Sequence, residues 1–349
     1  MQAYRLTGWQ QPPELQEVPV PDPGPGEVLV RVGGAGLCHS DLHVMDWPAG
    51  TLPYDLPFTL GHEVAGWVEA VGAGVPTEAP GALEVGQPVA VYGPWGCGRC
   101  HRCRQGVENL CENAGQLRAA GGGLGRDGGL APYMLVPSAR FLVPLGDLDP
   151  VEAAPLTDAG LTSYHAIKRS LSLLLPGSTA VVIGVGGLGH MAVQLLKALS
   201  PAQVVAVDVS QEKLALAREV GADAAVPAGE EAAGSVLEVS GRRGAELVLD
   251  MVGSDQTLAL AAQVVRPAGH LTLVGLAGGS LPFGFFRVPL EASLAAPYWG
   301  TVTELMEVLE LARAGRIRAH VERFRLVEVE EAYRRLRSGA VRGRAVVVP

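Results

Sequence analysis

Short apolar and polar stretches alternate with a period of two along the first 150 residues, for example at 28–32 and 64–68. Glycines and prolines that favour turns bound these stretches at 21–26 and 72–81. A two-residue period between turn signals is typical of half-buried strands. The sequence therefore predicts a β-rich, partly closed sheet domain in this part of the chain.

The pattern changes from about residue 179, where continuous apolar runs alternate with segments of helical period. The predicted strand and helix pairs are 180–183 with 188–199 and 204–207 with 211–220, and further apolar runs lie at 247–249 and 271–274. Alternating elements of these lengths build a parallel sheet with helices on both faces. The predicted fold class is α/β, with a doubly wound sheet beside the β-rich domain.

A third stretch follows residue 297. It contains two predicted helices, at 304–314 and 330–337, and a last strand at 345–348 that could return to the first domain. The predicted organisation is a first domain at 1–155 that is completed by 297–349, and a second domain at 156–296.

The composition and charge of the chain exclude several classes of function. Of the 349 residues, 48% are hydrophobic, which is enough for a sizeable core and about two domains. The formal net charge of −9, without a Lys or Arg run, argues against a nucleic-acid partner. The start lacks a signal-like pattern, and Pro176 interrupts the apolar stretch 171–199, so we expect no membrane span and a cytoplasmic location.

Four of the five cysteines lie within fifteen positions, at Cys97, Cys100, Cys103 and Cys111. Four thiols in one loop suit a closed tetrahedral site, so we predict a structural zinc. In a reducing compartment, clustered thiols favour a metal over disulfides. A redox site is the alternative for this cluster.

A glycine pattern, Gly184, Gly186 and Gly189, follows the apolar run 181–183 and opens a predicted helix. Such glycines let backbone amides approach a pyrophosphate. Asp208 ends the next predicted strand 19 residues after Gly189, where a carboxylate can accept hydrogen bonds from ribose hydroxyls. Residues 209–211 contain no arginine for a 2′-phosphate, so NAD is favoured over NADP. The alternative is that the glycines only permit close packing.

A second metal site is predicted around the remaining cysteine. A catalytic zinc keeps about three protein ligands and one open position. Cys38 and His62 are the natural first two, and no sixth cysteine exists to supply a third. Asp158 is the residue that we assign to it.

These residues resemble the zinc-dependent alcohol dehydrogenases of the medium-chain dehydrogenase/reductase superfamily, and most closely the bacterial NAD-dependent secondary alcohol dehydrogenases. The resemblance rests on the segments 36–41, 61–63 and 158–162, the four-cysteine lobe, the glycine pattern and residues 343–344. It implies a GroES-like barrel beside a Rossmann domain, with the active site in the cleft between them.

The resemblance also implies roles around the catalytic zinc. Cys38, His62 and Asp158 match the zinc ligands, and Glu63 matches an acidic residue near the metal. Asp41 matches the carboxylate that orients His62. Ser40 matches the hydroxyl that contacts the substrate oxygen, and His43 the position that passes the proton outward.

For the cofactor, Arg344 matches an arginine that binds the pyrophosphate, Lys213 a lysine near the adenosine ribose, and Thr162 a residue against the nicotinamide. The residues assigned to the nucleotide loop and its surroundings also include Gly187, Leu188 and Gly275. A basic residue often follows the first zinc ligand in relatives, and His39 replaces it here.

The implied activity is hydride transfer between a secondary alcohol, or a ketone in reverse, and NAD, with two zinc ions per chain. Trp47, Tyr54, Tyr298 and Trp299 are candidates for an apolar substrate pocket, with core packing as the alternative reading. A polyol or aldehyde dehydrogenase, or a nucleotide-binding sensor without turnover, are the competing functions. The runs 271–274 and 284–290 could extend a sheet across a subunit boundary, so we expect a homo-oligomer, a dimer or a tetramer.

Overall fold

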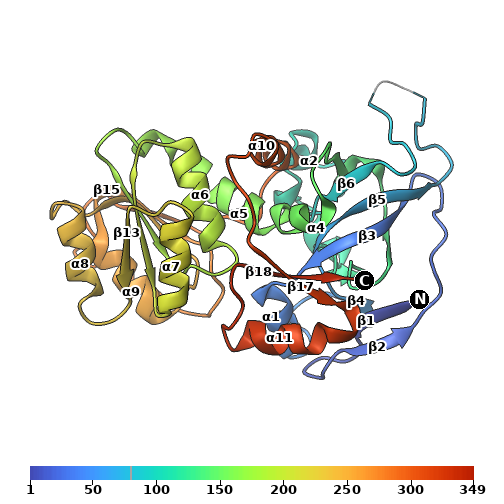
Figure 1. Ribbon diagram of the computed structural model, residues 1–349, viewed down its shortest axis with the longest axis horizontal. Helices are drawn as coiled ribbons and strands as arrows, with labels where there is room; N and C mark the ends of the chain where they lie inside the picture. Colours follow the sequence, from blue (N-terminus) through green and yellow to red (C-terminus); the bar gives the residue numbers. More distant parts are fainter. Residues whose placement is uncertain (79–80) are drawn as a thin grey trace. The chain divides into compact units, whose positions relative to one another are not determined.

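The computed structural model describes residues 1–78 and 81–349, so residues 79–80 of the turn region predicted at 72–81 lie outside the described residues. The chain forms two compact units (Figure 1). The first contains Met1–Leu161 and Trp299–Pro349, and the second contains Thr162–Tyr298.

The first unit is built on a seven-stranded sheet in the order β10-β6-β5-β3-β18-β17, with β9 also paired to β3. Its strands are β3 (Val28–Gly36), β5 (Glu63–Val71), β6 (Pro88–Val91), β9 (Tyr133–Val136), β10 (Leu142–Pro144), β17 (Val321–Arg325) and β18 (Arg344–Val348). A smaller sheet joins β2 (Glu14–Glu17), β1 (Gln2–Leu6) and β4 (Phe58–Thr59). The C-terminal β18 lies antiparallel to β3, with Val346 opposite Gly36.

Short helices complete this unit. They are α1 (His39–Asp46), α2 (His101–Arg104), α3 (Ala114–Leu117), α4 (Pro150–Ala153), α10 (Val302–Arg313) and α11 (Val329–Arg337), and the 3-10 turn η3 (Ala154–Thr157). Helix α10 begins with a capping box, in which Thr301 Oγ1 accepts from the Glu304 amide and Glu304 accepts from the Thr301 amide. Helix α5 (Ala159–Lys168) contains the boundary between the units.

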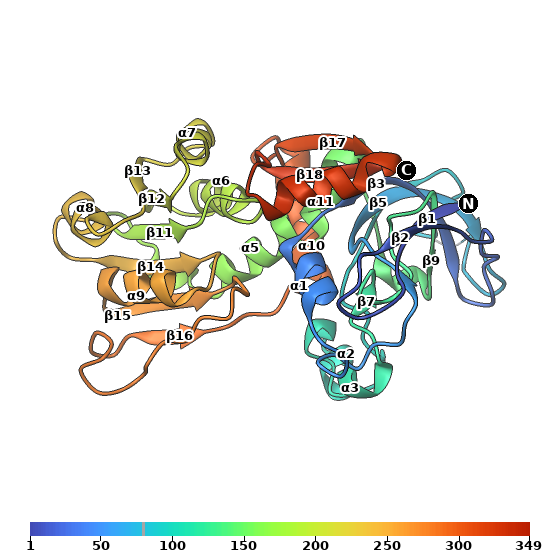
Figure 2. The ribbon, with the colours of Figure 1, turned by 90° about the horizontal axis from the view of Figure 1, so that it is seen from below.

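The second unit has a six-stranded parallel sheet in the order β13-β12-β11-β14-β15-β16. The strands are β11 (Thr179–Ile183), β12 (Gln203–Asp208), β13 (Ala224–Pro227), β14 (Ala245–Asp250), β15 (Val265–Leu273) and β16 (Ser293–Ala295). Helices α6 (Gly189–Leu199) and α7 (Gln211–Glu219) cover one face, and α8 (Ala232–Val239) and α9 (Asp255–Val264) cover the other (Figure 2). The predicted α/β class with a doubly wound sheet is confirmed.

The apolar run at 284–290, which we considered as a possible extension of a sheet, is not a strand within this chain. This segment forms turns, with the Arg287 amide bonded to the Gly284 carbonyl at 2.9 Å, and the edge strand β16 begins only at Ser293. Pro282 precedes the run and Pro289 lies within it, and proline lacks the amide that a strand ladder needs.

Among the described residues, no helix combines the length and apolar character needed to cross a membrane.

Candidate active site and metal centres

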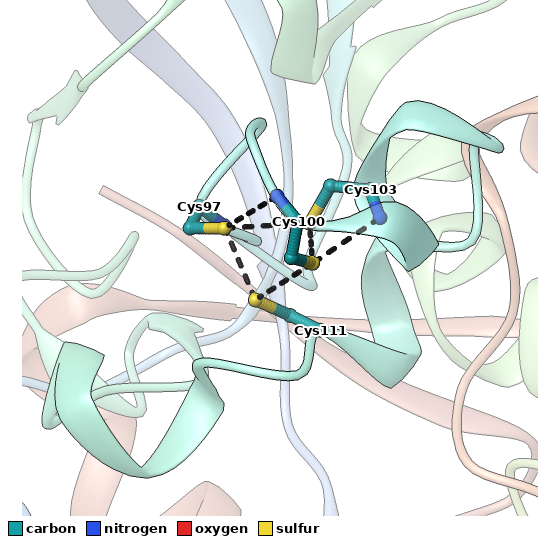
Figure 3. Close-up of side chains that lie close together, drawn as sticks. All are labelled: Cys97, Cys100, Cys103 and Cys111. Atoms are coloured by element: carbon teal, nitrogen blue, oxygen red, sulfur yellow. Dashed lines mark hydrogen bonds between the residues drawn. The ribbon is translucent and has the colours of Figure 1, made fainter.

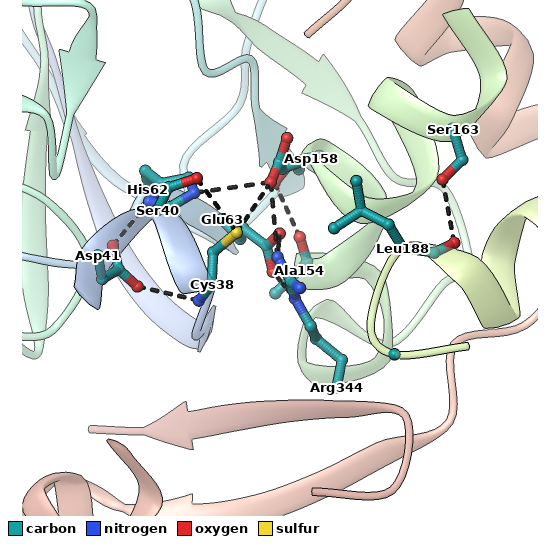
Figure 4. A network of polar contacts seen from close by, with 12 residues as sticks. Cys38, Ser40, Asp41, His62, Glu63, Ala154, Asp158, Ser163, Leu188 and Arg344 are labelled. Carbon is teal, nitrogen blue, oxygen red and sulfur yellow. Dashed lines mark hydrogen bonds and ion pairs between the residues drawn. The ribbon is translucent and has the colours of Figure 1, made fainter. Parts of the chain in front are cut away.

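Four buried side chains from three parts of the first unit meet at one point (Figure 4). Cys38 precedes α1, His62 directly precedes β5, Glu63 is the first residue of β5, and Asp158 follows η3. Each offers a ligand atom, and these atoms lie within 4.8 Å of one another. The sequence pattern could not show this meeting, because 120 residues separate Cys38 from Asp158.

The spacing of three of these atoms fits a tetrahedral metal. Asp158 Oδ2 lies 3.7 Å from Cys38 Sγ and 3.6 Å from His62 Nε2. Zinc bonds of about 2.0–2.3 Å in tetrahedral geometry place neighbouring ligand atoms about 3.3–3.8 Å apart. The set of one sulfur, one nitrogen and one oxygen is also a usual zinc shell. The residues present therefore fit the catalytic metal that the sequence predicts.

Asp41 holds two of these ligands in place. It is fully buried, and its Oδ1 lies 2.8 Å from His62 Nδ1 while its Oδ2 accepts from the Cys38 amide at 3.0 Å. With Nδ1 engaged by a carboxylate, the other ring nitrogen of His62 is left for a metal. Burial lowers the pKa of His62, but Asp41, Asp158 and Cys38 raise it well above the ordinary value. Such surplus negative charge is what a divalent cation would neutralise.

Replacing Asp41 with asparagine should weaken zinc at this site about 10- to 100-fold, because the charge that orients His62 is lost. The measurement is the rate at which a chelator removes zinc from the purified protein. The four-cysteine lobe should keep its zinc in the same sample, which makes it an internal control. Equal retention of both ions in the variant and the parent protein would contradict the role of Asp41.

Arg344 lies in this cluster instead of on the surface. It is 2% exposed, its Nε donates to Glu63 Oε2 at 2.9 Å, and its Nη2 also pairs with Glu63 Oε1. The same Nη2 lies 3.5 Å from Asp158 Oδ2. The pKa of Glu63 is raised to about 7, because the effect of burial exceeds the opposite effect of the Arg344 charge, which lowers it. The sequence predicted a cofactor contact for Arg344, and nothing in it indicated the pairing with Glu63.

The two predicted proton-relay residues sit on α1. Ser40 Oγ lies 3.5 Å from Cys38 Sγ, beside the metal ligands. The His43 ring stacks on Trp47 with 5.7 Å between ring centroids, and burial lowers the pKa of His43. The described contacts place Ser40 at the cluster and do not join His43 to it.

Of the four aromatic candidates for the substrate pocket, Trp299 lies at the metal cluster. Its ring meets the His62 ring edge-on at 5.6 Å, and its Nε1 donates to the Thr157 carbonyl at 3.0 Å. Its φ of 54° is unusual for a bulky residue, and such backbone is retained where the surroundings fix it. Tyr54 packs edge-on against Phe58, and Tyr298 belongs to the second unit.

The glycine loop between β11 and α6 has the backbone that the nucleotide motif requires. Gly184 has a φ of 89°, and a side chain at Gly189 would lie 1.9 Å from the Gly184 carbonyl oxygen. A side chain at Gly186 would meet nothing within 4 Å. The loop therefore leaves open space beside Gly186, which is what close approach of a phosphate to the loop backbone requires.

Asp208 is tied to the same loop. Its Oδ2 accepts from the Val185 amide at 2.7 Å, and its Oδ1 accepts from the Ser210 amide at 2.9 Å. The loop is also held by Ser163, whose hydroxyl donates to the Leu188 carbonyl at 3.1 Å (Figure 4). The other predicted cofactor residues in this unit are Thr162 on α5, Gly187 in the loop, Lys213 in the first turn of α7 and Gly275 after β15.

A Gly186→Ala substitution should lower the affinity for NADH at least tenfold, about 1.4 kcal/mol, because the methyl group would occupy space that the cofactor needs. The melting temperature should stay unchanged, since the new side chain meets no protein atom. Gly189→Ala is the matched contrast and should lower the melting temperature. Fluorescence titration with NADH and thermal unfolding of both variants test this, and unchanged NADH affinity in Gly186→Ala would contradict it.

The four clustered cysteines converge in a lobe of the first unit (Figure 3). Sulfur separations are 3.9 Å for Cys97–Cys103, 3.4 Å for Cys100–Cys103 and 3.9 Å for Cys100–Cys111. Zinc–sulfur bonds of about 2.3 Å place tetrahedral sulfurs about 3.8 Å apart, so the lobe fits a closed zinc shell. The amides of Arg99 and Cys100 lower the pKa of Cys97 to about 6, which favours the thiolate that binds metal.

Two family profiles match the chain. Residues 24–147 match the family described as alcohol dehydrogenase GroES-like domain, and residues 187–314 match the family described as zinc-binding dehydrogenase. Together with full-length relatives more than 30% identical, these matches show that the chain belongs to the zinc-dependent medium-chain alcohol dehydrogenases. The resemblance predicted from the sequence is confirmed.

The chain is similar over its whole length to individual members. It is 37% identical to a NAD-dependent alcohol dehydrogenase of Sulfurisphaera tokodaii, with all of both chains covered. It is 34% identical to a D-arabinose 1-dehydrogenase (NADP(+)) of Saccharolobus solfataricus, with 99% of this chain and 97% of the relative covered. The solved alcohol dehydrogenase of Aeropyrum pernix superposes with a TM-score of 0.91 at 39% identity, with both chains fully covered.

Proposed function

We propose that this protein transfers a hydride between a secondary alcohol, or a ketone in reverse, and NAD, and that it holds one catalytic and one structural zinc per chain. The observation that carries the proposal is the buried set of Cys38, His62 and Asp158 at tetrahedral spacing, with Asp41 behind His62. Family membership and the NAD dependence of a full-length relative support the reaction class.

Cys38, His62 and Asp158 would hold the catalytic zinc, and Cys97, Cys100, Cys103 and Cys111 the structural one. When bound, the catalytic zinc supplies Lewis acidity toward the alcohol oxygen, and NAD accepts the hydride. The chain's own residues position the ligands, exclude water and carry the proton.

Ser40 and His43 form the proposed path of the proton. Ser40 lies beside Cys38, and its hydroxyl would accept the proton that leaves the substrate hydroxyl and pass its own proton on. Burial lowers the pKa of His43, so its ring is neutral near pH 7 and can take that proton onward. Trp299, packed on His62, supplies an apolar wall that favours a hydrophobic substrate over a polyol.

The NAD contacts belong to the second unit in this proposal. The glycine loop 184–189 would bind the pyrophosphate, with Thr162 and Gly275 near the nicotinamide end and Lys213 near the adenosine. Asp208 would select NAD over NADP through the ribose hydroxyls. Arg344, from the first unit, remains the proposed partner of the pyrophosphate.

We also propose that the protein is cytoplasmic and forms a homo-oligomer. The edge strand β16 ends the parallel sheet, and the segment around it exposes Phe283, Phe285, Phe286 and Leu290, with 81% of Phe285 and 84% of Phe286 exposed. Exposed aromatic residues next to a free sheet edge favour pairing with another copy. Sedimentation should give a mass of two or four times 36.3 kDa, and a mass of 36.3 kDa would contradict the proposed homo-oligomer.

The alternative is a dehydrogenase for sugars or polyols, which the 34% identical D-arabinose 1-dehydrogenase favours. One experiment separates the two. Zinc per chain is measured on protein purified without chelator, and oxidation of 2-butanol, 1-phenylethanol, sorbitol and D-arabinose is compared with NAD and NADP. Two zincs and faster NAD-dependent turnover of the two secondary alcohols support the proposal. Faster turnover of sorbitol or D-arabinose would replace its substrate class.

A further inference from the structure

The C-terminal helix α11 packs against α1, the helix that follows Cys38 and carries Ser40 and Asp41 (Figure 1). The ends of the two helices are joined by Arg337, whose Nη1 and Nη2 donate to the Asp46 carboxylate at 2.7 and 3.0 Å. The helix that positions a zinc ligand therefore rests on a helix nearly 300 residues away in sequence.

One α11 side chain reaches the interior at this contact. Tyr333 is 5% exposed, and its ring stacks on Tyr4 with 5.9 Å between centroids. Its hydroxyl is fully buried, yet within the described residues, 1–78 and 81–349, no partner meets hydrogen-bond geometry. Buried hydroxyls are usually paired, so an unpaired donor at this helix contact calls for a nearby acceptor.

The candidate acceptor on the facing helix α1 is the buried carboxylate of Asp41. An ionised carboxylate has about four acceptor positions, and Asp41 uses one on His62 Nδ1 and one on the Cys38 amide. The pKa of Tyr333 is raised well above its ordinary value. Burial is the main cause, followed by the negative charge of Asp41 and the interaction of the hydroxyl with that carboxylate. The charge of Cys38 acts on Tyr333 in the same direction. The hydroxyl thus stays protonated and serves only as a donor toward this group.

We propose that Tyr333 is a positioning residue for the catalytic metal site, whose hydroxyl donates to the Asp41 carboxylate and so fixes the direction in which His62 presents Nε2. The inference rests on the proposed function, because it assumes that Cys38, His62 and Asp158 hold zinc. Tyr333 acts through Asp41 and touches neither substrate nor metal.

The test is Tyr333→Phe, which keeps the ring stacked on Tyr4 and removes only the hydroxyl. We expect a chelator to remove the catalytic zinc about three- to tenfold faster, a smaller effect than loss of Asp41 itself. We expect kcat to fall with it, while the KM for NAD and the zinc of the cysteine lobe stay unchanged. Tyr4→Phe is the matched control, because it removes the neighbouring phenol, whose acidic neighbour is Glu330.

A double-mutant cycle with Asp41→Asn separates positioning from general packing. If Tyr333 acts through Asp41, Tyr333→Phe should add little to zinc loss in the Asp41→Asn background. An additive effect, an equal effect of Tyr4→Phe, or wild-type zinc retention in Tyr333→Phe would each overturn the inference and leave the proposed function intact. A parent protein that carries only the lobe zinc would overturn both.

Discussion

Replacing His62 with alanine is expected to abolish alcohol oxidation, lowering kcat/KM by about four orders of magnitude, or about 5.5 kcal/mol of transition-state stabilisation. The physical reason is the loss of one of three metal ligands together with the partner of Asp41 Oδ1. The buried site would then hold three acidic groups against one arginine, with no histidine to complete the metal shell. Steady-state kinetics with 2-butanol and NAD, together with zinc per chain, measures the effect.

The control for this prediction is binding of NADH, which should remain close to that of the parent protein, because the glycine loop belongs to the second unit. His320→Ala serves as a matched substitution, since that histidine lies outside both metal clusters. Loss of NADH binding in His62→Ala would point to misfolding rather than to chemistry. Retained turnover at the level of His320→Ala would contradict the catalytic assignment of His62.

Local patterns in the sequence were sufficient to predict part of the second unit. The strands β11 and β12 are continuous apolar runs and α6 follows a 3.6-residue period, so these elements are specified by neighbours in the chain. The elements β13, α8, α9 and β16 were not predicted. The apolar run at 284–290, considered as a possible sheet extension, forms turns, since Pro282 and Pro289 cannot donate to a strand ladder. The rule that apolar residues are buried does not hold in this segment, since Phe285 and Phe286 are exposed.

The metal cluster was partly predictable for a different reason. Cys38, His62 and Asp158 were named because zinc chemistry restricts the ligand types, even though no spacing joins them. The pairing of Arg344 with Glu63, 281 residues apart, depends on β18 lying against β3 and leaves no local signal. The contact of Tyr333 with the surroundings of Asp41 likewise depends on the packing of α11 on α1. Long-range pairing of this kind is visible only in the folded chain.

A second large effect is expected from Cys103→Ser, which should release the zinc proposed for the cysteine lobe and unfold the lobe locally. Cys103 is buried, and its sulfur lies within 3.9 Å of those of Cys97 and Cys100. Serine keeps the shape of the side chain but does not supply the thiolate. Structural zinc contributes about 10–16 kcal/mol to the folding of small zinc domains, which is more than the stability of most domains.

The surrounding contacts limit how far this unfolding spreads. Arg140 Nη1 donates to Glu108 Oε1 at 2.7 Å and its Nη2 to the Gly96 carbonyl at 2.6 Å, so the base of the lobe stays tied to the rest of the first unit. We therefore expect one zinc per chain to remain, and protease cleavage to become rapid between residues 97 and 111 only. Cys38→Ser is the matched control. It should lose the zinc of the other site and leave the cysteine lobe resistant to the protease. Cleavage spread evenly over the chain, or loss of both ions in Cys103→Ser, would mean that the two metal sites do not fold independently.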